Sequence, residues 1–222
     1  MGQDTYDAVD LFIGQTLFAA EDEVLEAALA DAAAAGLPEI QVTPPQGRLL
    51  EILCRSIGAS QILEFGTLGG YSTIVMARTL PADGNLTTLE YDPDHAEVAW
   101  DNIERAGLGH LVDIRLGKAI DSLPKIAAEG GAPFDLVFID ADKPGNADYF
   151  AWAMKLTRVG SLVIVDNVVR NGAVIDANGD ANVQGARRLH EAMAKEPRVS
   201  ATAVQTVGSK GYDGFAIAVV TG

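Results

Sequence analysis

Two carboxylates and an ammonium follow a stretch of apolar residues in FDLVFIDADK, which reads as a buried strand. Asp140, Asp142 and Lys143 stand at the end of this strand. A later apolar run, SLVIVDN, ends in Asp166 and Asn167. If the two runs are parallel strands of one sheet, their ends could be neighbours. Two carboxylates and an amide carbonyl that converge on one point favour a hard cation such as Mg²⁺ or Ca²⁺.

The same polar residues also have a purely structural interpretation. Each aspartate could cap the helix that follows its strand. Capping explains one aspartate well but the clustering less well, because unpaired like charges repel one another. No histidine or thiolate joins the group, so zinc is not expected. Lys143 could accept a proton beside a cation, or it could form a salt bridge to Asp142 or remain a surface charge.

A glycine-containing turn in LEFGTLGGYS follows an earlier apolar run and opens a helix. Gly66, Gly69 and Gly70 would let a ligand approach the backbone, although many such turns need glycine for geometry alone. Glu90 ends the next apolar run, where an acid suits the two hydroxyls of a ribose. It could instead belong to a solvated helix start together with Asp92. The turn and Glu90 together indicate a nucleoside-type ligand.

Two residues distinguish between the candidate nucleosides. The dinucleotide fingerprint G-x-G-x-x-G has a second glycine that lets a pyrophosphate approach, and Leu68 stands at that position. Glu64 precedes the turn and would repel a pyrophosphate, whereas it would tolerate a cationic cofactor. S-adenosylmethionine has a ribose, a sulfonium and an ammonium but no phosphate, so it fits better than NAD.

The elements that must position these residues alternate along the chain. Helical patterns lie at roughly 5–18, 22–35, 45–57, 70–79, 93–106, 118–129, 145–157 and 182–195. The short apolar runs QILEF, NLTTLE, LVDIRL, FDLVFID and SLVIVDN alternate with most of the later helices. This rhythm predicts a parallel sheet that is covered on both faces. Two last runs, RVSATAVQTV and GFAIAVV, are joined by the turn GSKGYDG and predict an antiparallel hairpin at the sheet edge.

The expected fold class is therefore α/β. We predict a Rossmann-like, seven-stranded, mostly parallel sheet with helices on both faces, a C-terminal antiparallel hairpin and extra N-terminal helices. The length of 222 residues fits a single domain, 1–222, in which 1–40 form an N-terminal helical cap. Ligands of such sheets bind at the carboxyl ends of the strands, where the polar residues concentrate.

Composition limits the classes of partner and the compartment. The formal net charge of −15 argues against nucleic acid and disfavours an anionic membrane surface. No apolar run is long enough for a membrane helix, and the acidic start MGQDTYDAVD does not resemble a signal peptide. Cys54 is the single cysteine and lies among apolar residues, which predicts a buried core residue and no intramolecular disulfide. These features predict a cytoplasmic protein.

Four stretches together resemble one protein family. LEFGTLGGYS, TLEYDPDHAEVAWDNIERAGL, FIDADK and VDNVVRNG resemble the cation-dependent class I O-methyltransferases, which include catechol and caffeoyl-CoA O-methyltransferases and bacterial relatives. The resemblance runs from about residue 42 to the C-terminus. It implies transfer of a methyl group from S-adenosylmethionine to a hydroxyl of a small phenol, usually one of two vicinal hydroxyls. The family includes monomers and dimers, and we expect a homodimer.

The resemblance also implies roles for individual residues. The metal ligands would be Asp140, Asp166 and Asn167, holding Mg²⁺ or alternatively Ca²⁺ or Mn²⁺. Asp142 would hold the ammonium of the cofactor and Glu90 its ribose, while Lys143 matches the base that has been proposed for the family. The remaining residues implied to line the cofactor site, together with Asp140, are Val42, Glu64, Gly66, Thr67, Ser72 and Ala119.

The substrate side departs from the family pattern. Plant members carry an aromatic residue where this chain has Arg170, while Asn171 keeps the asparagine of the family. An arginine there suggests an acceptor with an anionic tail such as a carboxylate, or it is merely a surface charge. His190 stands in RRLHEAM where the family has an asparagine, and the turn GSKGYDG is longer than in the plant relatives.

Two other functions remain as alternatives. The first is an NAD-dependent oxidoreductase on a similar sheet, which Leu68 and the acidic cluster oppose. The second is a nucleoside-binding or metal-binding protein without catalysis, which would give no reason for Lys143 beside a cation. His95, Trp100 and Trp152 lie in helical patterns and are interpreted as packing or surface residues.

Overall fold

The computed structural model describes residues 2–18, 22–131 and 133–222. Residues 1 and 19–21, which fall within the predicted cap, and residue 132 lie outside the described residues. The helices, with two short 3₁₀ helices labelled η, are α1 (Gln3–Leu17), α2 (Glu23–Ala34), α3 (Pro44–Ile57), α4 (Tyr71–Ala77), α5 (Pro93–Arg105), α6 (Ala119–Glu129), η1 (Lys143–Gly145), α7 (Asn146–Leu156), η2 (Ala173–Ile175) and α8 (Ala181–Lys195). The strands are β1 (Gln61–Phe65), β2 (Asn85–Glu90), β3 (Val112–Leu116), β4 (Phe134–Ile139), β5 (Thr157–Asp166), β6 (Val199–Gly208) and β7 (Gly211–Val220).

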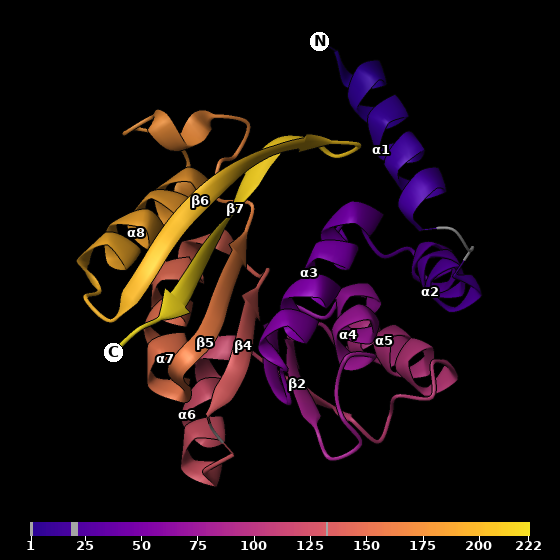
Figure 1. The fold of residues 1–222 in the computed structure, drawn as a ribbon, viewed down its shortest axis with the longest axis horizontal. Coiled ribbons are helices and arrows are strands. Elements are labelled where there is room, and N and C mark those ends of the chain that lie inside the picture. The colour runs from indigo at the N-terminus through magenta and orange to yellow at the C-terminus, as the bar shows by residue number, and fades with distance from the viewer. Residues whose placement is uncertain (1, 19–21, 132) are drawn as a thin grey trace.

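Within the described residues, seven strands form one sheet in the order β3-β2-β1-β4-β5-β7-β6 (Figure 1). The pairs that join β3 to β5 are parallel, and β7 pairs antiparallel with both β5 and β6. The predicted fold class is therefore confirmed, including the hairpin at the sheet edge. The strand order reverses between β1 and β4, which is the point where sheets of this type bind ligands.

Local sequence explains why the helices begin and end where they do. Thr43 accepts a hydrogen bond from the backbone of Gln46, whose side chain accepts one from the backbone of Thr43, and Pro44 and Pro45 occupy the first turn of α3. This capping box satisfies backbone donors that the helix itself cannot pair. Gly58 ends α3 in the left-handed conformation, with φ +62°. The predicted helix at 45–57 matches α3 almost residue for residue.

Two strand predictions were too short. β5 begins at Thr157 rather than at Ser161, because residues 158–160 are exposed and carry no apolar pattern. The hairpin strands continue through most of GSKGYDG, so only Ser209 and Lys210 form the turn. Pairing extends to Gly208 opposite Gly211, which places Asp213 inside β7. Polar residues join an edge ladder because the backbone supplies its hydrogen bonds.

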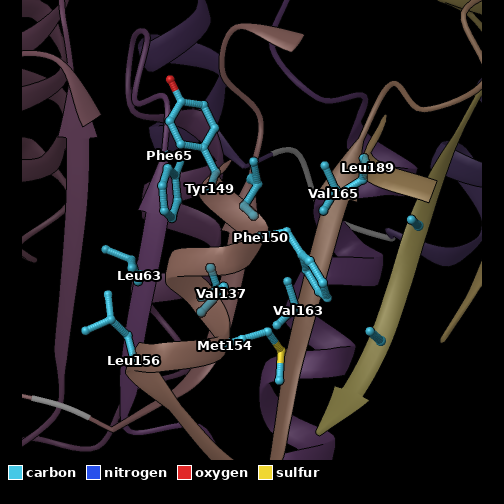
Figure 2. Close-up of a cluster of buried hydrophobic side chains, with 14 of the residues drawn as sticks. Leu63, Phe65, Val137, Tyr149, Phe150, Met154, Leu156, Val163, Val165 and Leu189 are labelled. Atoms are coloured by element: carbon cyan, nitrogen blue, oxygen red, sulfur yellow. The ribbon is translucent and has the colours of Figure 1, made fainter. Parts of the chain in front are cut away.

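The core lies on both faces of the sheet, because alternate residues of each buried strand point to opposite sides. One cluster packs Leu63, Phe65, Val137 and Val163 against α6, α7 and α8, and Figure 2 shows α7 beside these strands. The other packs alternate strand residues against α3, α4 and α5, and it includes Cys54, which is fully buried as predicted. No helix of the described residues is long and apolar enough to cross a membrane.

The first helix stands at the edge of the molecule, beside the tip of the β6–β7 hairpin (Figure 1). The side chain of Gln3 donates to the carbonyl of Gly208 at 3.0 Å, and Asp10 accepts from the backbone of Ser209 at 2.7 Å. No described residue of α1 is buried, and Leu11 and Phe12 are exposed. Polar contacts therefore hold α1 while an apolar part of its surface remains uncovered.

Two helical glycines give a matched test of the packing. A Cβ on Gly185 of α8 would overlap the carbonyl of Lys143 and come 2.8 Å from the nitrogen of Pro144. Gly185→Ala should therefore destabilise the fold by about 1–3 kcal/mol through overpacking. Gly14→Ala adds the same methyl group where the nearest atom, in Phe18, is 3.8 Å away, and it should stabilise by up to about 1 kcal/mol. Urea unfolding measures both changes, and equal shifts in the two variants would contradict the close contact.

Candidate functional site

A cavity of about 840 Å³ lies over the carboxyl ends of β1, β2, β4 and β5. Helix α2 and residues 40–42 form one of its walls. A volume of this size falls within the usual range for small-molecule sites. Most of the predicted site residues line the cavity, namely Val42, Gly66, Thr67, Ser72, Glu90, Ala119, Asp140, Asp142, Lys143, Asn167 and Arg170. Glu64, Asp166 and Asn171 do not line it.

The turn after β1 is pressed against the end of β4. Gly66 has φ +89°, and a Cβ there would overlap the carbonyl oxygen of Asp140. Only glycine therefore allows the two strand ends to approach this closely. Leu68, which stands in place of the second glycine of the dinucleotide fingerprint, also has a positive φ of +51°. A leucine in this conformation is strained and persists only where its surroundings hold it.

Glu90 holds this strained turn. One carboxylate oxygen accepts the backbone N–H groups of Thr67 at 3.0 Å and Leu68 at 2.8 Å. The other accepts those of Tyr91 at 2.8 Å and Asp92 at 2.9 Å. All four acceptor positions of the carboxylate are thus occupied by backbone donors. Ribose hydroxyls would have to share or replace some of these bonds, and the ribose role of Glu90 remains a prediction.

Glu64 lies behind the turn and is fully buried. Its oxygens accept hydrogen bonds from the hydroxyls of Ser72 at 2.6 Å and Thr73 at 2.5 Å. Burial raises the pKa of this carboxyl to about 7, although the hydroxyl donors oppose the shift. Among the residues that the structure describes, no Lys or Arg side chain forms a hydrogen bond or ion pair with Glu64. A cationic group near Glu64 would favour its ionised form.

Asp142 is already bonded on both oxygens. One accepts from the hydroxyl of Tyr149 and the other from the backbone of Gly145 at 3.1 Å. The ring of Tyr149 packs on Phe65 with the ring centroids 5.1 Å apart, so the hydroxyl position is fixed (Figure 2). Burial and the bond to Asp142 raise the pKa of the Tyr149 hydroxyl, which keeps it protonated as a donor. Asp142 is exposed and lines the cavity, where it could also meet a ligand ammonium.

The predicted convergence of two strand ends is present. Ile139 of β4 pairs with Val165 of β5, so Asp140 and Asp166 follow neighbouring positions. Lys143 is almost fully buried, and its ammonium lies 2.7 Å from a carboxylate oxygen of Asp140. Asp166 is only 5% exposed. Burial and the negative charge of Asp140 raise the pKa of Asp166 to about 7.

These residues fit a hard divalent cation by their chemistry. Asp140, Asp166 and Asn167 offer two carboxylates and one amide, which are the oxygen ligands that Mg²⁺ and Ca²⁺ prefer. Burial and the charge of Asp140 both raise the pKa of Asp166, and a cation beside this carboxylate would favour its ionised form. In the described part of the chain, no three His, Cys, Asp or Glu residues group around a common metal position. The fit therefore depends on Asn167 as the third ligand.

The two residues predicted to contact the substrate, Arg170 and Asn171, lie in different places relative to the cavity. Arg170 lines the cavity, and its guanidinium lies 3.9 Å from the carboxylate of Asp213. Asn171 is exposed and does not line the cavity. Both have left-handed backbone conformations, with φ +58° and +55°. The structure thus brings Arg170, but not Asn171, to the wall that an acceptor would meet.

Several residues at the site were not found from the sequence. His95 was interpreted as a packing or surface residue, but it lines the cavity 3.8 Å from Glu90. Tyr149 was predicted only as part of a helix. It is the fourth residue of α7, and nothing in the local sequence indicates that its hydroxyl donates to Asp142. Lys210, at the tip of the hairpin, donates to the carbonyls of Glu39 and Gln41, and burial lowers its pKa. Lys210 contacts residues that lie 171 and 169 positions away in the chain, and the contacts of His95 and Tyr149 join separate elements, so none of them leaves a local sequence pattern.

Comparisons with known proteins agree along nearly the whole chain. The family described as O-methyltransferase matches residues 15–216. The catechol O-methyltransferase of Niastella koreensis is 51% identical over 221 residues, which cover 99% of this chain and 100% of that protein. The structure of the O-methyltransferase from Bacillus cereus in complex with SAH has a TM-score of 0.97 at 53% identity, covering 99% of this chain and 100% of that chain. The structure of the O-methyltransferase TomG from Streptomyces achromogenes in complex with SAM has a TM-score of 0.96 at 49% identity. The match covers 100% of this chain and 100% of that chain.

The buried Glu64 carboxyl predicts a pH-dependent stability. The pKa of this carboxyl is about 7 in the folded protein and ordinarily 4.5, so the folded protein holds its proton more tightly than the unfolded chain does. Its contribution to stability is therefore full below about pH 4.5 and is lost as the pH rises through 7. Glu64→Gln keeps the shape without the ionisation, so its melting temperature should fall less than that of the wild type between pH 5 and 7.5. Glu97→Gln, at an exposed position of α5, is the matched control, and identical slopes for Glu64→Gln and the control would contradict the burial effect.

Proposed function

The chain belongs to the O-methyltransferase family, and from this we propose that it moves a methyl group from S-adenosylmethionine to one hydroxyl of a catechol-type small molecule, assisted by a divalent cation. The observation that carries the proposal is the carboxylate pair Asp140 and Asp166 beside Lys143, at the edge of one cavity. The name of the relative from Niastella koreensis supports a catechol acceptor. The SAH and SAM in the two similar structures support the cofactor.

The cofactor would occupy the part of the cavity between the β1 turn and α6. Asp142 would accept a hydrogen bond from the ammonium of the cofactor, and Glu90 would accept hydrogen bonds from the ribose hydroxyls of the cofactor. The small Gly66 and Ala119 leave room for close approach to the backbone. The other residues proposed to line the cofactor are Val42, Thr67, Ser72 and Asp140, whereas Glu64, also proposed for this site, lies behind the turn and would act on the cofactor through its charge. The net negative charge of this group suits a sulfonium cofactor and opposes a pyrophosphate.

A divalent cation would be held by Asp140, Asp166 and Asn167. When bound, it would supply positive charge that stabilises the phenolate form of the acceptor, whose hydroxyl ordinarily has a pKa of about 10, like tyrosine. Mg²⁺ is the proposed ion, because this ligand set consists of oxygen atoms alone.

Lys143 is proposed to handle the proton. In its neutral form the amine accepts the hydroxyl proton, and its burial against the end of β4 keeps it in one position. The phenol oxygen then forms a bond to the methyl carbon while the sulfur–carbon bond breaks, which leaves a neutral thioether. The chain contributes mainly by holding both reactants in line, which can supply much of the rate.

Arg170 is the residue proposed to select among acceptors. Its guanidinium lies at the cavity wall, and its nearest carboxylate, on Asp213, is 3.9 Å away and already accepts three backbone N–H bonds. The guanidinium therefore has donors left for an anionic tail such as a carboxylate. Asn171, which is exposed, would meet only the outer part of a larger acceptor.

The alternatives have less support. An NAD-dependent oxidoreductase would place a pyrophosphate against Leu68 and Glu64, and the family match gives it no support. A binding protein without catalysis would not need a buried lysine beside the acid pair.

We further propose that residues 1–222 form one catalytic domain in the cytoplasm and that the protein is a homodimer without nucleic-acid or membrane partners. The net charge of −15 opposes binding to nucleic acid. The exposed apolar residues of α1, such as Leu11 and Phe12, and the exposed edge strand β6 are surfaces that a second copy could cover.

The reaction can be tested with labelled S-adenosylmethionine and two acceptors, catechol and caffeic acid. Methyl transfer should require Mg²⁺, stop when EDTA is added and return when Mg²⁺ is restored in excess. Lys143→Met should lower kcat by about 10²–10⁴-fold, the usual contribution of a positioned base, while the cofactor still binds.

Lys125→Met, at an exposed position of α6, is the matched control and should transfer at the wild-type rate. Transfer that is indifferent to EDTA would overturn the role of the cation. Cofactor binding without transfer to either acceptor would overturn the acceptor class but leave the family assignment intact.

A further inference from the structure

The turn that follows β5 is strained. Asn167, Arg170 and Asn171 have φ values of +57°, +58° and +55°, and Gly172 follows with +83°. This left-handed conformation costs most side chains other than glycine roughly 1–2 kcal/mol; asparagine tolerates it better, so Arg170 bears most of the strain. Such a backbone persists only where neighbouring groups hold it. The strain matters because this turn carries Asn167, a proposed cation ligand, and Arg170, a proposed acceptor contact.

One carboxylate oxygen on β7 holds this turn. Oδ1 of Asp213 accepts the backbone N–H of Val169 at 3.0 Å and that of Arg170 at 2.8 Å. It also accepts the N–H of its own neighbour Gly214 at 3.0 Å. The two bonds to the turn fix consecutive peptide groups of the strained segment.

The strand that carries Asp213 cannot easily shift. The backbone N–H of Val168 donates to the carbonyl of Gly214 at 2.9 Å, directly beside the antiparallel pair of Asp166 with Phe215. A Cβ on Gly214 would overlap the carbonyl of Val204 on β6 and come 2.7 Å from the side chain of Val169. β7 is therefore held between β6 and the turn, so the carboxylate of Asp213 has a fixed position from which it can hold the turn.

We propose that Asp213 is a positioning residue, which fixes the 167–171 turn so that the amide of Asn167 can serve the cation site. This inference rests on the proposed function, because the cation site itself is part of that proposal. Asp213 is not among the proposed cation ligands and does not line the cavity. Its Oδ1 is occupied by three N–H groups, and the Oδ2 atom faces the guanidinium of Arg170.

The proposal separates the position of an oxygen from its charge. Asp213→Asn keeps an oxygen at the Oδ1 position without the negative charge, so the turn should stay in place. Asp213→Glu keeps the charge but moves the oxygen by one methylene, so the turn should relax. Asp213→Ala removes both. If Asp213 acts by positioning the turn, the Asp213→Asn variant should still bind the cation as the wild type does. The Asp213→Glu and Asp213→Ala variants should bind it more weakly.

A matched control lies at the opposite end of the sheet. Asp135 also accepts from two consecutive backbone N–H groups, those of Ser60 at 2.8 Å and Gln61 at 3.0 Å. It too is paired with an arginine, Arg158. Asp135→Ala should therefore reduce stability through the same kind of loss, but it removes nothing from the cation site.

The experiment measures Mn²⁺ binding to the full chain by electron paramagnetic resonance of the free ion, without acceptor or turnover. The dissociation constant should rise about 10–100-fold in Asp213→Ala and Asp213→Glu, as it does when other groups that orient metal ligands are lost. It should stay near the wild-type value in Asp213→Asn and Asp135→Ala. If Asp213→Ala fails to fold, the Asn and Glu variants still decide between position and charge.

The other results each overturn a definite statement. Equal binding by the wild type, Asp213→Glu and Asp213→Ala would overturn the positioning role and leave the proposed function standing. Weak binding by Asp213→Asn with strong binding by Asp213→Glu would show that charge, not position, is what Asp213 supplies. A wild type that does not bind Mn²⁺ would remove the cation from the proposed function, and the role of Asp213 would fall with it.

Discussion

Two carboxylates at neighbouring strand ends, one of them buried, are the constraint on which the site depends. Asp140 and Asp166 follow paired positions of β4 and β5, and burial together with the negative charge of Asp140 raises the pKa of Asp166. One ammonium, from Lys143, contacts Asp140 at 2.7 Å. Although this ammonium opposes the shift, burial and the charge of Asp140 keep the pKa of Asp166 raised to about 7. A divalent cation between the two carboxylates would favour their ionised forms, so the proposed chemistry of the site follows from this arrangement.

Close backbone contacts bring the strand ends into this arrangement. Gly66 lets the β1 turn lie against the carbonyl of Asp140, and Gly185 lets α8 lie against the carbonyl of Lys143. Helix α8 thereby supports the short helix η1 from behind, while the β1 turn supports the end of β4 from the side. The hydrogen bonds that Glu90 and Asp213 accept hold the two strained turns beside them. The site is thus held in place by close contacts between backbone segments, which glycine allows at Gly66 and Gly185.

The sequence predicted those parts of the fold and site that have a local signal. Capping residues and apolar runs identified α3, β1 and β4 closely, and the acids that end the strands identified most of the cavity wall. The start of β5 at Thr157 was missed because exposed strand residues carry no apolar pattern. Asp213 was assigned to a turn, since nothing local reveals that the hairpin ladder extends through it. Tyr149 and His95 were missed for a related reason, because their partners come from other elements of the sheet edge.

Asp140, Asp166 and Asn167 are proposed to form one cation site. The anomalous scattering of Mn²⁺ in crystals of the protein grown with Mn²⁺ and S-adenosylmethionine would test this site. We expect one strong peak within bonding distance of oxygens from all three residues, with Lys143 still beside Asp140. A map without a peak at this position, or with Mn²⁺ bound only elsewhere, would contradict it.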